Sequence, residues 1–492
     1  MTGLRDASYD PIMVRNRRWP LLAWIAGLSV IASVTLSVVK AARAPITYDE
    51  AYTYLRFARQ PSRAILRDYH LPNNHIAHSL LVRAATRRFG NGPLAIRLPA
   101  LVGGLACFAG MIFLARRLDA HVGTVWLALV AWTPALIDYN GLARGYSLGC
   151  GLSFLAIVAL LLSGECRLKK PRGNRVHSGA CLVIAGVLSG TAIGCVPVFG
   201  IVTVAASMAF LLIELWPIGR ASIRRTVVNG ALIATGAVPT CLGYYWWVQV
   251  RPSKWPWGYD NAGELIHDFW TNTFNLSGGL SQTSSIWLAV GVGLLGSVGA
   301  AVARSRRDKP GGLLLLTWVL SIAVLVIART TAGSLWPFAR TLLFFVPLTM
   351  LALVYAPLSW LSRLPRARSL ASVASVGAMM IWTVVNFDSR VHPVWRSSAG
   401  VPWAMAEIDR TRPADEPTTI RIPWGIDMCM EYELLRRPRP NVRITTEGDA
   451  DYCILFDPGG IPSDRLHLAT RDASSGLTVL GPLPRSPDPV AG

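Results

Sequence analysis

Charged residues are scarce in this sequence, and acidic ones most of all. Only 15% of the 492 residues are charged, with 28 Asp and Glu against 48 Lys and Arg. A soluble globular chain carries about 25% charged residues, so an ordinary soluble domain is excluded. Hydrophobic residues make up 52% of the chain and gather in runs of about 20, the length of a helix that crosses a bilayer. The sequence therefore predicts a mainly α-helical, polytopic membrane protein.

Common signatures of redox, zinc and nucleotide chemistry are also missing. The eight cysteines form no CxxC pair and no zinc-like spacing. Cys429 and Cys453 lie in the polar C-terminal part, where they either pair or stay free according to the compartment that this part faces. That part contains no GxGxxG, GKS/T or HExxH motif, so we assign it no chemistry of its own.

The excess of positive charge is best explained by the membrane. The net charge is +20. In a polytopic protein such an excess marks cytoplasmic loops and contact with anionic lipid, so the composition predicts membrane lipids as partners and no nucleic acid.

Eleven apolar segments are expected to span the membrane. Basic clusters such as residues 166–175 and 304–309 alternate between them and place the N-terminus in the cytoplasm by the positive-inside rule. We interpret the first segment as a retained helix, since it is too long for a signal-peptide core. The expected spans are 19–40, 97–115, 122–137, 147–163, 178–196, 198–216, 226–248, 285–303, 311–328, 341–358 and 369–387.

An odd number of spans leaves the C-terminal part outside the cytoplasm. We expect a transmembrane domain over residues 1–387 and an extracytoplasmic α/β domain over 388–492. Within the latter, TTIRIPW and YCILF have strand composition, and MCMEYELLRR has helical composition.

The first external loop, residues 41–97, violates the positive-inside rule. It carries nine arginines and no lysine. Arginine presents a rigid fork of donors that matches phosphate oxygens; the alternative is solvated helix faces lying on lipid head groups. Tyr52, Arg56, Arg59 and Arg63 follow helical spacing, as do the apolar Ile76, Leu80, Leu81 and Ala84 opposite Arg83 and Arg87.

Four motifs, in order along the chain, resemble the GT-C superfamily of membrane glycosyltransferases. They are the Asp49-Glu50 pair in YDEAYTY, FGNGPLAIRLPALVGGL (89–105), NGLARGYSLG (140–149) and WPFARTLLFFVPL (336–348). The resemblance is to the branch of protein O-mannosyltransferases and the lipid A aminoarabinose transferase, and it covers about residues 15–360. It implies transfer of a sugar from a polyprenyl phosphate to an extracytoplasmic glycan, lipid or protein acceptor at the plasma (inner) membrane.

The resemblance also implies roles for individual residues. Asp49 is expected to be the general base that takes the proton of the acceptor hydroxyl, with inversion if a single carboxylate acts. Glu50 is expected to assist, by orienting the acceptor or by holding a metal. The developing charge on the phosphate needs cations; we expect Arg144 and Arg340 there, with Arg56 and Arg97 as weaker candidates.

The remaining candidates surround this centre. Asn74 and His75 are candidates for binding sugar hydroxyls, and His75 with Glu50 for a divalent cation, although two such residues do not define a metal site. Tyr146 is a candidate support for Arg144, and Asp138 a candidate for lining the same cavity.

Two other functions stay open. A transporter or flippase of a lipid-linked sugar is the first, but it is expected to carry ionisable residues near the middle of its spans. A non-catalytic relative that scaffolds other enzymes is the second.

Overall fold

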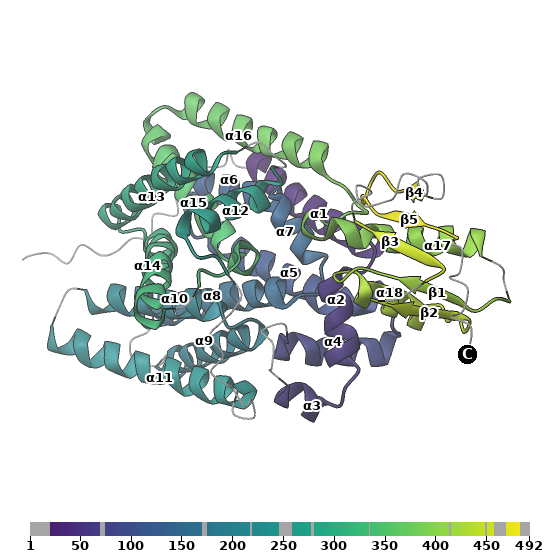
Figure 1. Ribbon diagram of the computed structural model, residues 1–492. Coiled ribbons are helices and arrows are strands. Elements are labelled where there is room, and N and C mark those ends of the chain that lie inside the picture. Colours follow the sequence, from purple (N-terminus) through teal and green to yellow (C-terminus); the bar gives the residue numbers. More distant parts are fainter. Residues whose placement is uncertain are drawn as a thin grey trace, which may run out of the picture.

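The structure is a computed structural model that describes residues 20–68, 74–169, 175–216, 219–245, 258–276, 280–333, 335–412, 415–447, 450–456 and 469–482. Long apolar helices form a bundle, and a small sheet lies at one end of it (Figure 1). The mainly α, polytopic class predicted from composition is confirmed.

Every predicted apolar segment that the structure describes is helical. Within the described residues, nine helices are long and apolar enough to span a membrane: α1 (Pro20–Arg43), α5 (Pro93–Ala115), α8 (Gly145–Lys169), α9 (Arg175–Cys195), α11 (Arg220–Tyr245), α13 (Gln282–Ser305), α14 (Lys309–Ala332), α15 (Phe345–Trp360) and α16 (Pro365–Asn386). The expected count of eleven includes two segments that differ from a straight span. One of these is α10 (Phe199–Leu215), which has only 17 residues.

The other exception is the segment expected over 122–137. It consists of α6 (Ala120–Ala131) and α7 (Pro134–Asn140), which meet at a bend of 59°. Pro134 begins α7, and a proline cannot donate the backbone hydrogen bond that would continue α6 into it. The bend turns the chain toward the 140–149 segment.

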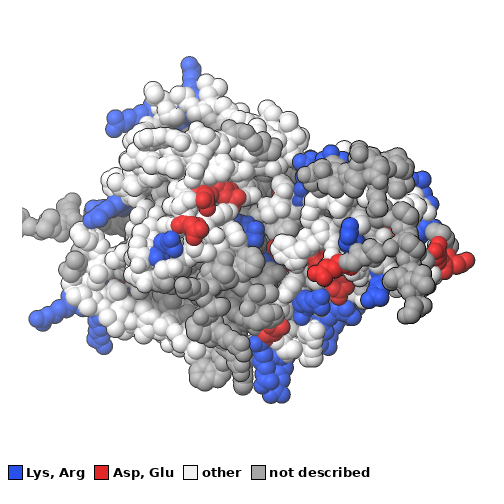
Figure 2. All heavy atoms as spheres, in the orientation of Figure 1, with Lys and Arg blue, Asp and Glu red and all other residues white. Residues whose placement is uncertain are grey.

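Apolar side chains on the outside of the bundle support its placement in lipid. In α1, Leu21, Trp24, Leu28 and Ile31 are all more than half exposed and recur with helical spacing. In Figure 2 most of the visible surface of the helical bundle is uncharged, and charged side chains lie at its rim, over the sheet end and in a small group on its face. The chain is a multi-pass membrane protein.

The loop between α1 and α5 folds into several short helical segments. They are α2 (Tyr48–Tyr52), a π-helical turn η1 (Thr53–Ala58), α3 (Ser62–Arg67) and α4 (Ile76–Phe89). The π-helical turn and Pro61 break the predicted face of Tyr52, Arg56, Arg59 and Arg63, because both change the helical register.

The predicted apolar face of α4 is also shifted. Arg83 is buried and donates to the carbonyls of Ala58 and Arg59, whereas Leu81 is 45% exposed. The expected opposition of apolar and basic faces is therefore wrong for this helix.

The C-terminal part has the predicted α/β composition. Its elements after α16 are the 3₁₀ turn η4 (Pro393–Gly400), α17 (Val401–Thr411), β1 (Thr418–Arg421), α18 (Asp427–Arg436), β2 (Val442–Thr445), β3 (Tyr452–Leu455), β4 (Ala469–Arg471) and β5 (Thr478–Leu480). The strands form a mixed sheet of order β2-β1-β3-β5-β4, in which β1 is parallel to β2 and β3, and β5 is antiparallel to β3 and β4. The strands and the helix predicted in this part are confirmed.

The sheet end and the 41–97 loop share one hydrophobic core. Ile46, Tyr54 and Val82 of the loop belong to the same buried cluster as Met430 and Tyr432 of α18. The Tyr432 hydroxyl donates to the Asn91 carbonyl at 2.9 Å, and α18 packs against α2. The C-terminal part therefore helps to hold the helix that carries Asp49.

Cys429 and Cys453 are both buried and free. The Cys429 thiol donates instead to the Ile46 carbonyl at 3.4 Å, and Cys453 packs on the other side of the sheet with Leu480. The open possibility of a disulfide between them is not realised in this structure.

Candidate functional site

Asp49 lies in the first turn of α2, at the start of the loop. Thr47 caps this helix: its hydroxyl accepts from the Glu50 amide, and the Glu50 carboxylate accepts from the Thr47 amide, which forms a capping box. The cap fixes the first turn and leaves the Asp49 side chain 14% exposed. Asp49 is thus a nearly buried carboxylate with some access to solvent.

Glu50 points the other way, into a fully buried pair with Arg97. Glu50 Oε1 accepts from Arg97 Nε and Oε2 from Arg97 Nη2, both at 2.7 Å. Oε1 also accepts from the Ala143 amide at 2.6 Å, and Oε2 from the Thr47 amide at 2.9 Å. Four hydrogen bonds use the acceptor capacity of the carboxylate.

Arg97 is equally occupied. Its Nη1 donates to the carbonyls of Ala41 and Ala44, and its Nη2 also donates to the carbonyl of Pro45. With the two bonds to Glu50, all five donors of the guanidinium are in use. Arg97 therefore offers nothing to a phosphate, and the roles expected for Glu50 and Arg97 are replaced by a structural one: they join α1, α2, α5 and the segment before Arg144.

Arg144 approaches Asp49 from the segment between α7 and α8. Its Nη2 lies 3.6 Å from Asp49 Oδ2, and its Nη1 donates to the Thr53 hydroxyl at 3.3 Å. Arg144 is 3% exposed, yet its Nε has no hydrogen-bond partner in the part of the chain that the structure describes. A buried guanidinium with an unpaired N–H donor lowers the stability of the fold unless a ligand accepts that hydrogen bond.

Arg340 reaches the same place from a distant part of the chain, the short 3₁₀ turn η2 (Ala339–Leu342). It donates to the Tyr146 hydroxyl. Burial alone lowers the pKa of Arg340, but the facing Tyr146 and Asp49 raise it overall. Its Nε, too, meets no hydrogen-bond acceptor among the residues that the structure describes. Two guanidiniums thus face one carboxylate, each with a spare donor.

Aromatic rings surround the two arginines. The Tyr146 ring lies 5.6 Å from the Arg144 guanidinium and 5.6 Å from the Tyr139 ring. Trp395, from η4, lies 5.7 Å from the Arg340 guanidinium and 6.5 Å from the Tyr139 ring. These rings exclude water from one side of the arginines, which strengthens their interaction with an anion.

His75 and His78 complete the buried end of the site. The His75 ring lies 5.4 Å from the Tyr146 ring, and the ring nitrogens of both histidines have no hydrogen-bond partner of normal geometry among the described residues. Burial, followed by the nearby Arg144, lowers the pKa of both and brings that of His78 to about 3. Both imidazoles are therefore neutral at physiological pH.

The expected cation site does not fit these residues. Glu50 has no free oxygen, and His75 faces two arginines, which repel a cation. Among the described residues no three His, Cys, Asp or Glu side chains come together in a group that could hold a metal ion. We derive no step through a metal.

Three other candidates have partners elsewhere. Arg56 is exposed and pairs with Glu431 of α18 at 3.2 Å. The Asn74 amide donates to the carbonyls of Ile65 and Asp68 and accepts from Ser79, so it holds α3 to α4. Asp138 pairs with Lys40 of α1.

Sequence reasoning did not identify Thr53, Tyr139 and Trp395. Tyr139 adjoins the NGLARGYSLG segment, and its position next to that motif was a signal that could have found it. Trp395 carries no such signal, because it lies in the C-terminal part and reaches Arg340 only through the tertiary fold.

The sequence matches no protein-family model, and no curated protein is similar to it in sequence. In structure, the chain is similar to apo ArnT from Cupriavidus metallidurans, with a TM-score of 0.53 and 14% identity over 94% of this chain and 98% of that one. The chain has a GT-C fold. The expected fold is thus confirmed by comparison with a solved structure.

Two further solved structures are similar at lower scores. ArnT from the same organism bound to undecaprenyl phosphate has a TM-score of 0.49, with the same identity and coverage. The apo oligosaccharyltransferase of Archaeoglobus fulgidus has a TM-score of 0.48 and 15% identity, over 84% of this chain and 63% of that one.

Proposed function

We propose that this GT-C protein is a glycosyltransferase of the plasma (inner) membrane that moves a sugar from a polyprenyl phosphate to an extracytoplasmic acceptor. The observation that carries the proposal is the meeting of Asp49, Arg144 and Arg340, which come from three distant segments, at one end of an otherwise apolar bundle. A carboxylate beside one buried and one half-buried guanidinium, each with a spare donor, supplies a base and an anion site together.

In the proposed mechanism the donor phosphate binds Arg144 and Arg340 and takes over their interactions with Asp49. Asp49 is then free to accept the proton of an acceptor hydroxyl as the oxygen attacks the anomeric carbon. The bond between that carbon and the phosphate oxygen breaks, and its electron pair leaves with the lipid phosphate, where the two arginines stabilise the charge. Because Glu50 is occupied by Arg97, one carboxylate acts, which supports a single displacement with inversion.

The transporter alternative has less support. In the described spans the charged side chains lie near the helix ends, as with Lys40 in α1, Glu165 in α8 and Arg329 in α14. A transporter needs polar groups near the middle of the bilayer, where its substrate crosses. The charges of this chain instead favour chemistry at one membrane surface.

The proposal is tested with Asp49→Asn in a strain of the source organism from which the chromosomal gene for this protein has been deleted. Envelope glycans are compared by mass spectrometry after complementation with the wild type, Asp49→Asn or Asp409→Asn, at matched membrane levels. Asp409 is a carboxylate that pairs with Arg439 in the C-terminal part, far from the proposed base, so it serves as the control. We expect the wild type and Asp409→Asn to restore one glycosyl modification and Asp49→Asn to leave it absent.

The same proteins are purified and titrated with undecaprenyl phosphate, the lipid that ArnT of Cupriavidus metallidurans binds. Asp49→Asn should bind it at least as well as the wild type, because the two arginines lose a competing anion. If Asp49→Asn restores the glycosyl modification to the wild-type level, Asp49 is not the base. Unchanged envelope glycans in the strain without the gene contradict the proposed function itself.

A further inference from the structure

A short turn of the C-terminal part touches two sides of the proposed reaction centre. It is η4, the eight-residue turn that follows α16. The Ser398 hydroxyl of η4 accepts a hydrogen bond from the Tyr48 amide at 3.2 Å, and Tyr48 directly precedes Asp49 in α2. The Trp395 ring of η4 lies 5.7 Å from the Arg340 guanidinium. One turn therefore contacts both the helix that carries the proposed base and an arginine proposed to bind the phosphate.

The turn is anchored to the rest of the C-terminal part on both sides of Ser398. Arg396, the residue after Trp395, donates from Nε to the Ser474 carbonyl at 2.7 Å. Gly400 lies so close to Ser475 that a Cβ in its place would meet Ser475 Oγ at 2.1 Å. These contacts tie the position of Trp395 to the C-terminal part and not to the membrane helices.

Arg340 is held largely by aromatic rings. The Phe338 ring lies 4.5 Å from its guanidinium carbon, and the Trp395 ring lies on it as well. The guanidinium donates to the Tyr146 hydroxyl, but its Nε meets no acceptor among the described residues. The face of an aromatic ring attracts a guanidinium electrostatically without serving as a lone-pair acceptor for its N–H groups. Ring contacts therefore fix the guanidinium and leave N–H donors for an anion.

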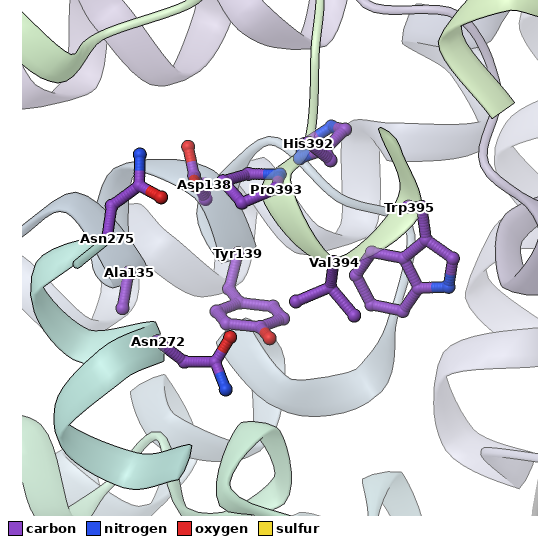
Figure 3. A pocket seen from close by; sticks show the side chains of 9 residues that line it. All are labelled: Ala135, Asp138, Tyr139, Asn272, Asn275, His392, Pro393, Val394 and Trp395. Atoms are coloured by element: carbon purple, nitrogen blue, oxygen red, sulfur yellow. The ribbon is translucent and has the colours of Figure 1, made fainter. Parts of the chain in front are cut away.

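The other surroundings of Trp395 offer no ligand site of their own. Its ring packs edge-to-face against the Tyr139 ring of α7, with 6.5 Å between the ring centres. Both side chains line a small hollow together with Asn272 of α12 (Ala262–Phe274) (Figure 3). The hollow has a volume of about 20 Å³, which holds about one water and no sugar or phosphate. The role of Trp395 therefore lies in its contact with Arg340.

Arg340 needs such support more than Arg144 does. Arg144 is 3% exposed and donates to the Thr53 hydroxyl. Arg340 is only half-buried and extends from the four-residue turn η2. A long side chain in such a place has many rotamers, and fixing it costs entropy when a ligand binds. A ring that already holds the guanidinium in one position removes part of this cost.

We propose that Trp395 is a positioning residue that holds the Arg340 guanidinium where the phosphate of the lipid donor binds. The C-terminal part thereby completes the donor site of the membrane domain. The inference rests on the proposed function and adds a residue to its donor site. Trp395 acts through Arg340 and does not touch the reacting atoms, so its loss should matter only while Arg340 is present.

The test is a double-mutant cycle, which measures whether two side chains act together. Trp395→Leu removes the ring, Trp395→Phe keeps a ring, and Trp395→Leu is also combined with Arg340→Gln. Trp403→Leu is the matched control, because Trp403 of α17 is a half-buried tryptophan that packs on the core of the C-terminal part. Trp395→Met, which is unbranched and also lacks a ring, replaces Trp395→Leu throughout if the leucine variant does not fold.

The Kd for undecaprenyl phosphate is measured calorimetrically on each purified protein. Trp395→Leu should raise it about tenfold, the effect of losing one desolvated cation–π contact. Trp395→Phe should raise it less, because phenylalanine binds cations more weakly than tryptophan but still offers a ring. Trp403→Leu should leave the Kd unchanged. In the Arg340→Gln protein, Trp395→Leu should change the Kd by less than about twofold, because its partner is already lost.

A wild-type Kd in Trp395→Leu overturns the inference. The same rise in Kd with and without Arg340 also overturns it, because Trp395 would then act independently of that arginine. If the wild type binds no undecaprenyl phosphate, the donor site and the role of Trp395 both fail. The envelope glycans of the deletion strain decide the proposed function separately: if they are unchanged while the cycle shows coupling, that function is wrong and the role of Trp395 in lipid phosphate binding stands.

Discussion

The buried carboxylate of Glu50 and the buried guanidinium of Arg97 form an ion pair that holds in place the residues next to Asp49 and Arg144. Asp49 is next to Glu50 in the chain, and Arg144 is next to Ala143. The hydrogen bond from the Ala143 amide to Glu50 therefore helps to set the distance between Asp49 and Arg144. Such fully satisfied networks are costly to break, because each partner is left as an uncompensated buried charge.

Arg97→Met should lower the free energy of unfolding by about 3–5 kcal/mol, the cost of leaving a buried carboxylate unpaired. Thermal unfolding of the detergent-solubilised protein, followed by tryptophan fluorescence, measures the change. The control is Arg56→Met, since Arg56 and Glu431 form an exposed pair that should contribute less than about 1 kcal/mol. The double variant Arg97→Met with Glu50→Gln should be more stable than Arg97→Met alone. Equal losses for Arg97→Met and Arg56→Met would contradict a structural role of the buried pair.

Arg340→Gln should weaken the binding of undecaprenyl phosphate by about 1.5–3 kcal/mol, the range for hydrogen bonds to charged groups. This corresponds to a ten- to hundredfold rise in Kd. Titration of the purified protein, followed by intrinsic fluorescence, provides the measurement. Arg390→Gln removes an exposed arginine near α16 and should leave the Kd unchanged. If both variants bind like the wild type, Arg340 does not contact the phosphate.

Stability should fall as the pH drops from 7 to 5, in part because of His78. Its pKa is about 3 in the folded protein and about 6.5 in an unfolded chain. Below pH 6.5 the unfolded state binds the extra proton, so stability is lost at up to about 1.4 kcal/mol per pH unit until the pH reaches the folded pKa. His78→Leu should make the pH dependence of the unfolding temperature shallower.

The matched control for His78 is His177→Leu, which changes an exposed histidine of α9. It should keep the wild-type slope between pH 7 and 5, because the substitution changes an exposed side chain and leaves the buried His78 in place. An unchanged slope in His78→Leu would show that other groups govern the acid lability.

Cys429 and Cys453 should both be reduced and protected in the folded protein. Each is 1% exposed, and burial raises the pKa of the Cys429 thiol, which suppresses the reactive thiolate. Maleimide should label neither residue under native conditions and both after denaturation without reductant, as measured by peptide mass spectrometry. A peptide pair linked through these two cysteines would contradict the structure.

The periodic elements were predictable because they depend on neighbours in sequence. Apolar runs of about 20 residues give the spans, and the strands and helix of the C-terminal part follow from local composition. Deviations arise where local pattern and packing compete. Pro134 bends one span, and the π-helical turn after Tyr52 removes the arginine face that simple helical spacing predicts.

The sequence by itself determined the membrane class, the α/β character of the C-terminal part and the choice of Asp49, Arg144 and Arg340 as candidates. Only the tertiary structure decided which charges remain available. Arg97 and Glu50 sit in the motifs as prominently as Arg144 and Asp49, but their bonds to each other and to neighbouring backbone groups use every donor and acceptor they have. Arg56 pairs with Glu431. Trp395 of the C-terminal part lies 5.7 Å from the Arg340 guanidinium, a contact that only the tertiary fold creates. Hydrogen-bond satisfaction depends on three-dimensional neighbours, so no spacing along the chain reveals it.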